Sequence, residues 1–420
     1  MSGEHPATGG VGGPEAPPTL NNAAEFTSAA REDEPPPLPG ERWDPVGLDT
    51  DEMILQMGPQ HPATHGVLRV ELRTDGEVVK AARPHIGYLH RCFEKHCENV
   101  DYPGVMPYTD RMDYVAAMGN TLGFALAVEK LAGIEVSPYV NTIRVIIAEL
   151  QRIASHCVAV GTYTMDIGAF TPFLHLLRDR EKVLDLFEWT CGARLLYNYN
   201  WVGGVSHDLP DGFARATRDL LREFDAVTMP ELIDLIIGNK IFIKRLAGVG
   251  VCSPELGISY DLTGPNLRGS GVARDLRKDA PYSDYQEYDF DVALGEGRFG
   301  PLGSCFDRNW VRVVEMRESS KILHQALDRL EKMEKTDVHE KVPKRVKVPK
   351  GEVYFRSEAP RGQLGYYVVS DGKANPYRVK VKSPCFTAMS VFHHLARGMM
   401  IADIVALIGS LDIVLGEIDR

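Results

Sequence analysis

The chain has 420 residues, of which 44% are hydrophobic and 25% are charged, and its formal net charge is −11. These proportions are ordinary for a soluble globular protein and exclude collagen-like, coiled-coil and fully disordered chains. The negative net charge argues against nonspecific nucleic-acid binding, which needs a basic surface. Seven cysteines, an odd number in a long chain, favour reduced thiols in a cytoplasmic setting over a disulfide framework.

The length indicates about three domains, or two domains with extensions. Within the helical patterns, the longest uncharged stretch is the 15 residues 114–128, whereas a membrane span needs about 20 apolar residues. The N-terminus lacks the basic start and the apolar stretch of a signal peptide. We therefore expect neither a membrane span nor a signal peptide.

Residues 1–48 are predicted to be a disordered tail. Eight of the first forty residues are proline, and the proline-rich run 34–40 cannot form a helix or a sheet ladder. The tail has few large apolar residues, so burial cannot offset the entropy of ordering it.

Residues 49–107 are predicted to form a β-rich N-terminal domain. Strands are expected at 53–57 and along the alternating run 67–73, and the pair Asp75-Gly76 predicts a hairpin turn before a strand at 78–81.

Helical periodicity dominates residues 108–340, which we predict to form a helical bundle. One helix is expected to begin at Thr109 or Asp110 and to end at Leu131, because Gly133 follows. The other expected helices are 141–166, 171–197 with Pro172 near its start, 214–224, 230–237 and 310–333.

Residues 341–420 are predicted to form a C-terminal extension. The segment 341–350 holds five basic residues and two prolines, which indicates a linker or an extended arm. Beyond it, strands are expected at 352–355, 365–369 and 377–381, and a last helical region at 388–410.

Two histidines lie close together in the motif His61-Pro62-Ala63-Thr64-His65-Gly66. Their spacing could put both on one helix face as metal ligands, but Pro62 and Gly66 favour a turn, and no Glu follows the first His as in a metalloprotease helix. We interpret the motif as a loop that presents two imidazoles. In the alternative interpretation, both histidines are simply satisfied by backbone groups of a hairpin turn. The rigid residues around both rings favour a functional loop.

Segment 85–97 contains three histidines and two cysteines, which invites a zinc hypothesis. The spacing of Cys92 and Cys97 is poor for zinc, so a surface helix with solvated charges is favoured. At the expected helix start, the charges of the motif 110–114 are usually capping groups in a solvated first turn. If that end were buried, Arg111 would need an anionic partner.

The segment 295–300 formally matches a dinucleotide-binding fingerprint, Gly-x-Gly-x-x-Gly. Pro301 and Gly303 follow where the helix of that motif should continue, so we predict a loop. The chain contains no Gly-x-Ser-x-Gly elbow, Walker loop or Cys-x-x-Cys pair. We therefore expect it to hold no iron–sulfur cluster of its own.

The segment 57–69, which includes both histidines of the loop, resembles the D subunit (the 49-kilodalton subunit) of proton-pumping NADH:quinone oxidoreductase, respiratory complex I. The likeness covers about residues 52–420. Its further motifs, in the same order as in the family, lie at 84–91, 110–114, 150–156, 168–173, 357–362 and 409–420.

The resemblance implies a mainly α fold with a β-rich N-terminal part, related to the large subunit of nickel–iron hydrogenases. In the hydrogenases two Cys-x-x-Cys pairs hold the metal. The surrounding motifs match these pairs to Asp113 and Ala116, and to Val414 and Glu417. Because no thiolate remains there, ligand chemistry excludes a nickel–iron centre, and we expect no bound metal.

In this family the corresponding cavity receives the headgroup of a quinone. By motif match, His65 and Tyr114 are expected to hydrogen-bond the two quinone oxygens, Asp166 to pair with His65, and His61 to be accessory. Tyrosine and histidine are both hydrogen-bond donors, and histidine exchanges protons near neutral pH. Both suit a reaction that must deliver two protons to the quinone oxygens.

The resemblance also implies partners and a location. Electrons would come from a 4Fe-4S cluster in the neighbouring B subunit, and Arg91 and Arg111 match positions beside that cluster. The C subunit and the membrane-embedded H subunit are further expected partners. The chain would then act only within the complex, which couples quinone reduction to proton translocation, peripherally on the cytoplasmic side of the bacterial inner membrane.

The chain departs from the family pattern at several points. Cys92 stands where members usually carry Gly, and Cys97 is not part of the pattern. Leu196 stands where several ubiquinone-linked members carry a histidine near the cluster, which slightly favours menaquinone over ubiquinone as acceptor. Many members have about forty more residues, including a His-His-Phe helix, between Asp337 and Lys347. The proline-rich tail is also not typical of the family.

Three alternatives compete with this interpretation. The first is the same subunit in a ferredoxin- or deazaflavin-driven quinone-reducing complex, which this chain cannot distinguish because it never touches the electron donor. The second is a membrane-bound hydrogenase subunit, against which the missing cysteine pairs argue. The third is a hydrogenase-like scaffold without catalysis, against which the presence of His65, Tyr114 and Asp166 argues.

Overall fold

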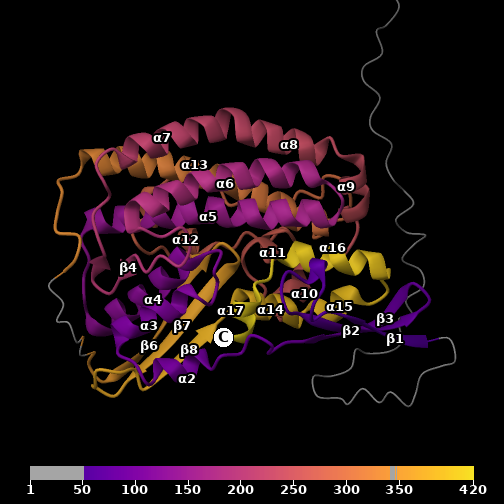
Figure 1. The fold of residues 1–420 in the computed structure, drawn as a ribbon, viewed down its shortest axis with the longest axis horizontal. Coiled ribbons are helices and arrows are strands. Elements are labelled where there is room, and N and C mark those ends of the chain that lie inside the picture. Colours follow the sequence, from indigo (N-terminus) through magenta and orange to yellow (C-terminus); the bar gives the residue numbers. More distant parts are fainter. Residues whose placement is uncertain (1–51, 341–345, 347) are drawn as a thin grey trace, which may run out of the picture. The chain divides into compact units, whose positions relative to one another are not determined.

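A computed structural model describes residues 52–340, 346 and 348–420 (Figure 1). The predicted disordered tail lies outside the described residues, and so does most of the first half of the predicted linker. The described part of the chain is mainly helical, with one sheet near each end of the chain.

The N-terminal sheet is antiparallel and has the order β1-β2-β3, with β1 at Glu52–Met57, β2 at Arg69–Asp75 and β3 at Val78–His85. The expected hairpin is confirmed, because Gly76 has a left-handed φ of 55° between the two paired strands. Side chains along β2 point alternately to the two faces of the sheet, and every second one, Val70, Leu72 and Thr74, is buried. The long segment between β1 and β2 is therefore held at both ends by paired strands.

Three long helices form the centre of the bundle: α5 at Pro138–Asp166 packs against α6 at Phe170–Cys191 and against α13 at Cys305–Lys332 (Figure 1). Helix α5 starts at Ser137, whose hydroxyl accepts a bond from the Val140 backbone, with proline at the first helical position. Helix α13 starts with a capping box between Ser304 and Asp307. The apolar side chains of α5, among them Ile143, Ile146 and Leu150, are buried in the main core.

Two predicted helix boundaries near the candidate site are wrong, and the helix expected at 310–333 begins earlier, at Cys305. The single helix expected from 109 or 110 to 131 is two helices, α3 at Tyr102–Asp110 and α4 at Ala117–Ala132, separated by the non-helical segment 111–116. The helix expected to reach Tyr197 ends at Cys191, because Gly192 takes the left-handed conformation that ends a helix. Both errors concern loops that carry or adjoin candidate site residues.

The C-terminal sheet has the order β6-β7-β8, with β6 at Gly351–Ala359, β7 at Gly362–Ser370 and β8 at Arg378–Lys382. This confirms the three predicted strands, although β6 and β7 are longer than expected. Helix α4 packs on β6 and β7.

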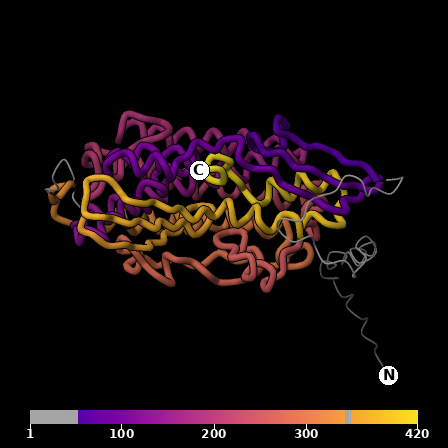
Figure 2. The backbone as a smooth tube through the Cα atoms, turned by 90° about the horizontal axis from the view of Figure 1, so that it is seen from below, coloured from indigo at the N-terminus to yellow at the C-terminus, as the bar shows by residue number. Residues whose placement is uncertain are grey.

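The single helical region expected at 388–410 is interrupted by Gly398. Four helices instead cover the end of the chain: α14 at Pro384–Ser390, α15 at Phe392–Ala396, α16 at Ile401–Leu411 and α17 at Leu415–Asp419. Figure 2 shows the C-terminus lying against the early part of the chain. There the carboxylate of Asp419 accepts bonds from the backbone of Gly87 and Leu89, at 2.8 and 2.7 Å.

The remaining elements connect these layers. The predicted helices 214–224 and 230–237 are confirmed as α7 and α8, which are joined by a π-helical turn. The segment 295–300 is a loop, as predicted. The elements are α2 at Phe93–Cys97, β4 at Asn200–Trp201, β5 at Gly204–Val205, α7 at Phe213–Glu223, the π-turn at Phe224–Thr228, α8 at Met229–Ile237, α9 at Lys240–Leu246, α10 at Pro254–Ser259, α11 at Gly264–Arg268, α12 at Leu276–Asp279, and short 3-10 turns at Pro62–Thr64 and Tyr285–Glu287.

Candidate functional site

The loop that follows β1 presents two imidazoles, as the sequence predicts. It begins at Gly58, where a Cβ atom would lie 2.0 Å from the Leu68 carbonyl oxygen, so only glycine fits. His61 is exposed, and its Nδ1 accepts a bond from the Ala63 backbone at 3.2 Å. His65 ends the short turn with a left-handed φ of 53°. The turn therefore satisfies His61 by a backbone group and leaves His65 to reach a distant partner.

That partner is Asp166, the last residue of α5. The Nε2 atom of His65 lies 2.5 Å from Oδ2 of Asp166, and the two side chains are only 17% and 8% exposed. Among the described residues, no hydrogen bond joins the Asp166 carboxylate to nearby backbone, as a residue that merely ended the helix would make. The expected pairing of these two side chains is therefore present in the geometry.

Tyr114 lies in the segment 111–116, between α3 and α4, and is half-buried. Its neighbour Asp113 is 1% exposed and accepts a 2.6 Å bond from the guanidinium of Arg361. Arg361 also donates to Asp412, at 3.2 Å. The expectation of a solvated first helix turn at 110–114 is wrong here, because this segment is not helical and Asp113 is a buried partner of Arg361.

The segment 412–417 contacts both the histidine loop and the side chain of Tyr114. The side chain of Leu415 lies 3.5 Å from where a Cβ on Gly66 would be, and a Cβ on Gly416 would lie 3.5 Å from the ring of Tyr114. The C-terminal segment thus lies against both the loop that carries His65 and the tyrosine. The His65–Asp166 pair and Tyr114 consequently flank one short stretch of chain.

Burial and charge set the protonation of these groups. Burial raises the pKa of Tyr114, and the negative charge of Asp113 adds to that rise. Burial also raises the pKa of Asp113, against the opposing charge of Arg361. For Asp412 burial acts in the same direction, but Arg361 and Arg312 outweigh it and hold the pKa of that carboxyl below its usual value. A tyrosine that keeps its proton can act as a hydrogen-bond donor.

A second set of buried charged side chains lies where α5 packs against α13. Glu149 accepts bonds from Arg152 and Arg277, each at 3.2 Å. Arg268 lies 2.6 Å from Glu315. Burial opposes the ionisation of Glu315, yet Arg268 and its other neighbours hold the pKa of this carboxyl well below its usual value. Most of these partners are far apart in the chain, so no local pattern in the sequence reveals them.

The two arginines matched to a partner cluster are both exposed. Arg91 follows the turn that Asp419 holds, and Arg111 follows α3 and donates a 2.6 Å bond to the Pro107 carbonyl. Next to Arg111, Asp110 accepts a bond from the Asn198 backbone at 2.8 Å, which ties α3 to the loop that carries Leu196. Arg111 is thus solvated and needs no buried anionic partner.

Cys92 and Cys97 lie at opposite ends of α2 and in different surroundings. Cys92 is exposed and precedes α2, whereas Cys97 is buried at the end of the same helix. Burial raises the pKa of Cys97 to about 12, so its thiol stays protonated at neutral pH. In the part of the chain that the structure describes, no group of three or more His, Cys, Asp or Glu side chains could hold a metal ion.

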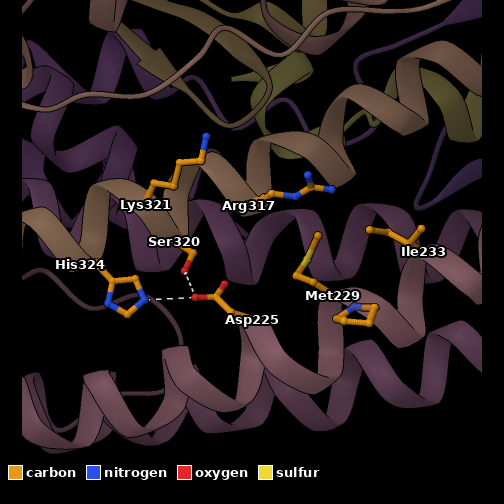
Figure 3. A pocket seen from close by; sticks show the side chains of 8 residues that line it. Asp225, Met229, Ile233, Arg317, Ser320, Lys321 and His324 are labelled. Atoms are coloured by element: carbon orange, nitrogen blue, oxygen red, sulfur yellow. Dashed lines mark hydrogen bonds and ion pairs between the residues drawn. The ribbon is translucent and has the colours of Figure 1, made fainter.

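A separate cavity of about 320 Å³ lies between α8 and α13 (Figure 3). Asp225, near the start of the π-turn, accepts a bond there from Ser320 at 2.9 Å and lies 3.1 Å from His324. Arg317 and Lys321 line the same cavity. None of the candidate site residues lines it, so this cavity is not the site described above.

Comparisons with known proteins identify the class of this chain. Residues 166–420 match the family described as "Respiratory-chain NADH dehydrogenase, 49 Kd subunit". The chain is 53% identical over 374 residues to the D subunit of NADH-quinone oxidoreductase from Chlorobium luteolum, covering 89% of this chain and 94% of that protein. The protein of the same name from Chlorobaculum tepidum is 53% identical over 374 residues, covering 89% and 93%.

The chain therefore belongs to the family of the 49-kilodalton, or D, subunits of respiratory NADH-quinone oxidoreductases. This confirms the resemblance drawn from the motifs. Relatives of this kind do not favour the ferredoxin-driven, deazaflavin-driven or scaffold alternatives. Among the described residues, no helix is both long and apolar enough to cross a membrane.

Proposed function

We propose that this chain is the quinone-site subunit of a proton-translocating NADH-quinone oxidoreductase. His65 and Tyr114 donate hydrogen bonds to the two quinone oxygens, Asp166 holds His65, and His61 is accessory on the same loop. The reduced quinone takes one proton from each donor, and proton uptake is coupled to translocation through Asp166.

The observation that carries this proposal is the position of both donors around the segment 412–417. One donor is fixed by a buried carboxylate 2.5 Å away, and the other keeps its proton because burial raises the pKa of Tyr114. A quinone needs two such donors, one for each oxygen. The fold is expected to be related to that of the hydrogenase large subunit, with the metal ligands replaced by Asp113, Ala116, Val414 and Glu417.

The electrons come from NADH through a 4Fe-4S cluster of the B subunit, beside the exposed Arg91 and Arg111. The C subunit and the membrane-embedded H subunit complete the immediate surroundings. This chain lies on the cytoplasmic side of the bacterial inner membrane, to which it is attached through its partners. Leu196, in place of a histidine near the cluster, favours menaquinone over ubiquinone as acceptor.

The test is the variant Tyr114→Phe in the assembled complex. One lost hydrogen bond is worth about 0.5–1.5 kcal/mol, so we expect apparent quinone affinity or turnover to fall roughly threefold to tenfold. Because the hydroxyl is also a proton donor, its loss should deepen the fall in turnover to roughly a hundredfold. Reduction of the iron–sulfur clusters by NADH should remain as in the wild type.

The matched control is Tyr377→Phe, which removes the same hydroxyl from a side chain that is 66% exposed, directly before β8. It should leave quinone reduction unchanged. If Tyr114→Phe matched the wild type in both turnover and apparent quinone affinity, Tyr114 would not bind the headgroup.

A further inference from the structure

Glu417 is a buried carboxyl whose hydrogen-bonding neighbour is a thiol, that of Cys385. It lies in α17, is 1% exposed, and among the described residues no nitrogen or hydroxyl group donates a hydrogen bond to either carboxyl oxygen. An ionised carboxylate in such a position would be strongly disfavoured, because burial removes its solvation and a thiol, a weak donor, replaces little of it. The geometry alone therefore favours the neutral, protonated acid.

The groups that face Glu417 explain why it stays neutral. They come from the segment 111–116, the β6–β7 turn, β7, α14 and the chain end, and they are Asp113, Arg361, Tyr366, Cys385 and Arg420. Burial raises the pKa of Glu417 to about 8, and the negative charge of Asp113 adds to the rise.

The two cations near Glu417 are already engaged. Arg361 bonds to Asp113 and Asp412, and Arg420 donates to the Val381 carbonyl at 2.6 Å. Neither oxygen of Glu417 takes a hydrogen bond from these guanidinium groups, so the carboxyl holds its proton at neutral pH.

Cys385 connects this acid to the candidate site. Its sulfur accepts a 3.5 Å bond from the Val414 backbone, which fixes the thiol against the segment that carries Glu417. Three groups, Asp113, Arg361 and Cys385, interact electrostatically with both Glu417 and Tyr114. The first two are bonded to each other, whereas the thiol makes a long, weak 3.9 Å bond to the Asp412 carbonyl, so it is the group of the three that can pass a proton.

The backbone brings the tyrosine close to the same place. Gly416, the residue before Glu417, lies against the ring of Tyr114. The segment 412–417 therefore lies against both Cys385 and Tyr114, and Glu417, Cys385 and Tyr114 are all partly or fully buried.

We infer that Glu417 is a proton store that reloads Tyr114 through the thiol of Cys385 after the tyrosine has protonated the quinone. This inference rests on the proposed quinone-site role. Glu417 does not touch the quinone and acts through Tyr114. No solvent access to the tyrosine is then needed during the redox step.

The proton balance is simple. The quinone receives two electrons from the partner's iron–sulfur cluster, one proton from His65 and one from the Tyr114 hydroxyl, whose O–H bond breaks. The phenolate of Tyr114 then takes the proton of the Cys385 thiol while the thiol takes the proton of Glu417. Because the two transfers occur together, no free thiolate forms. Glu417 becomes a carboxylate and regains a proton from solvent before the next turnover.

The first test is Glu417→Gln in the assembled complex, with Glu417→Asp as the matched control that keeps a titrating acid. Glutamine holds the size but has no acidic proton, so quinone reduction should fall roughly a hundredfold, the low end of what acid–base groups contribute. In the wild type, the rate should decline as the pH rises through about 8, where the store loses its proton. That decline should persist in Glu417→Asp and be absent in Glu417→Gln.

The second test does not depend on Glu417 variants assembling. Cys385→Ser keeps a group that can pass a proton, whereas Cys385→Ala does not, so Ser should stay near the wild-type rate and Ala should be at least about tenfold slower. Equal rates for the two would overturn the inference, and so would a wild-type rate and pH profile in Glu417→Gln. Suppose that either of these two results is found while Tyr114→Phe still reduces quinone slowly. The role of Glu417 as a proton store is then rejected, whereas the proposed quinone-site role of this chain stands.

Discussion

Arg361 illustrates that the candidate site is held together by single residues from distant parts of the chain and not by one sequence motif. Its guanidinium bonds to Asp113 and Asp412, which lie 248 and 51 residues away in the chain. Removing one member of such a buried group leaves the others unpaired, at a cost of about 3–5 kcal/mol. The charges around Tyr114 therefore hold the C-terminal segment and the break between α3 and α4 in one arrangement.

Asp166 is the residue through which redox chemistry would reach the rest of the complex. When His65 gives its proton to the reduced quinone, the pair loses its attraction and leaves a carboxylate that is only 8% exposed. A poorly solvated charge must then move, take up a proton or pull on neighbouring groups. Under the proposed function, the pair would thus be a physical route from quinone reduction to proton movement.

The variant Asp166→Asn separates this role from a structural one, because asparagine keeps the size and the hydrogen bonding but removes the charge. We expect an assembled complex with intact clusters and quinone reductase activity lowered by roughly a hundredfold, within the range of acid–base contributions. The measurements are NADH-driven quinone reduction and proton pumping in vesicles. Wild-type turnover with full pumping would reject the coupling role.

The sequence identifies only part of this residue-scale picture. His65, Tyr114 and Asp166 stand in recognisable motifs, and the structure brings His65 and Asp166 within bonding distance. The motifs mark Glu417 only as a position that has lost a metal ligand, because its burial and its contact with Cys385 depend on the packing of α17 against α14. Long-range partners leave no local pattern to find.

At the scale of elements, most strands and helices follow from periodicity and end signals, and the failures occur where tertiary contacts decide. Periodicity places the starts of α5 and α13 at 141 and 310 and the end of α6 at 197, whereas the caps Ser137 and Ser304 and the left-handed Gly192 put them at 138, 305 and 191. The break at 111–116 contains neither glycine nor proline. It is stabilised by the bond from Arg361 to Asp113, which helix propensity cannot foresee.

The contact between α16 and α5 depends on the absence of a side chain at Gly409. A Cβ there would lie 2.3 Å from the ring of Tyr163, which is buried in α5. Gly409→Ala should therefore destabilise the chain by about 1–3 kcal/mol through overpacking.

The control is Gly119→Ala in α4, where the nearest atom to a new Cβ is 3.8 Å away. This change should stabilise by up to about 1 kcal/mol, because alanine loses less backbone entropy than glycine in a helix. The thermal inactivation midpoint of the assembled complex should fall for Gly409→Ala and not for Gly119→Ala. Equal midpoints would mean that the helices shift to accept the methyl group.

At the scale of the whole molecule, the N-terminal sheet ends in an edge that the described residues leave uncovered. Strand β1 pairs only with β2, and its consecutive residues Met53, Ile54 and Leu55 are 54%, 39% and 36% exposed. An apolar edge strand with free backbone groups is a template for association. Such an edge fits a subunit that meets a partner rather than one that works alone.

We therefore expect the isolated chain to self-associate. The triple variant Met53→Thr, Ile54→Thr, Leu55→Thr keeps β propensity but removes the apolar surface, so it should raise the monomer fraction in light scattering after size-exclusion chromatography. Ile241→Thr is the control, because that side chain is 70% exposed on α9, outside the sheet, and should change nothing. If the edge is a partner surface, the triple variant should also assemble poorly into the complex. A monodisperse wild-type monomer with a cooperative melt would contradict the dependence on partners. If Ile241→Thr raised the monomer fraction as much as the triple variant does, exposed apolar area in general, and not this edge, would drive the association.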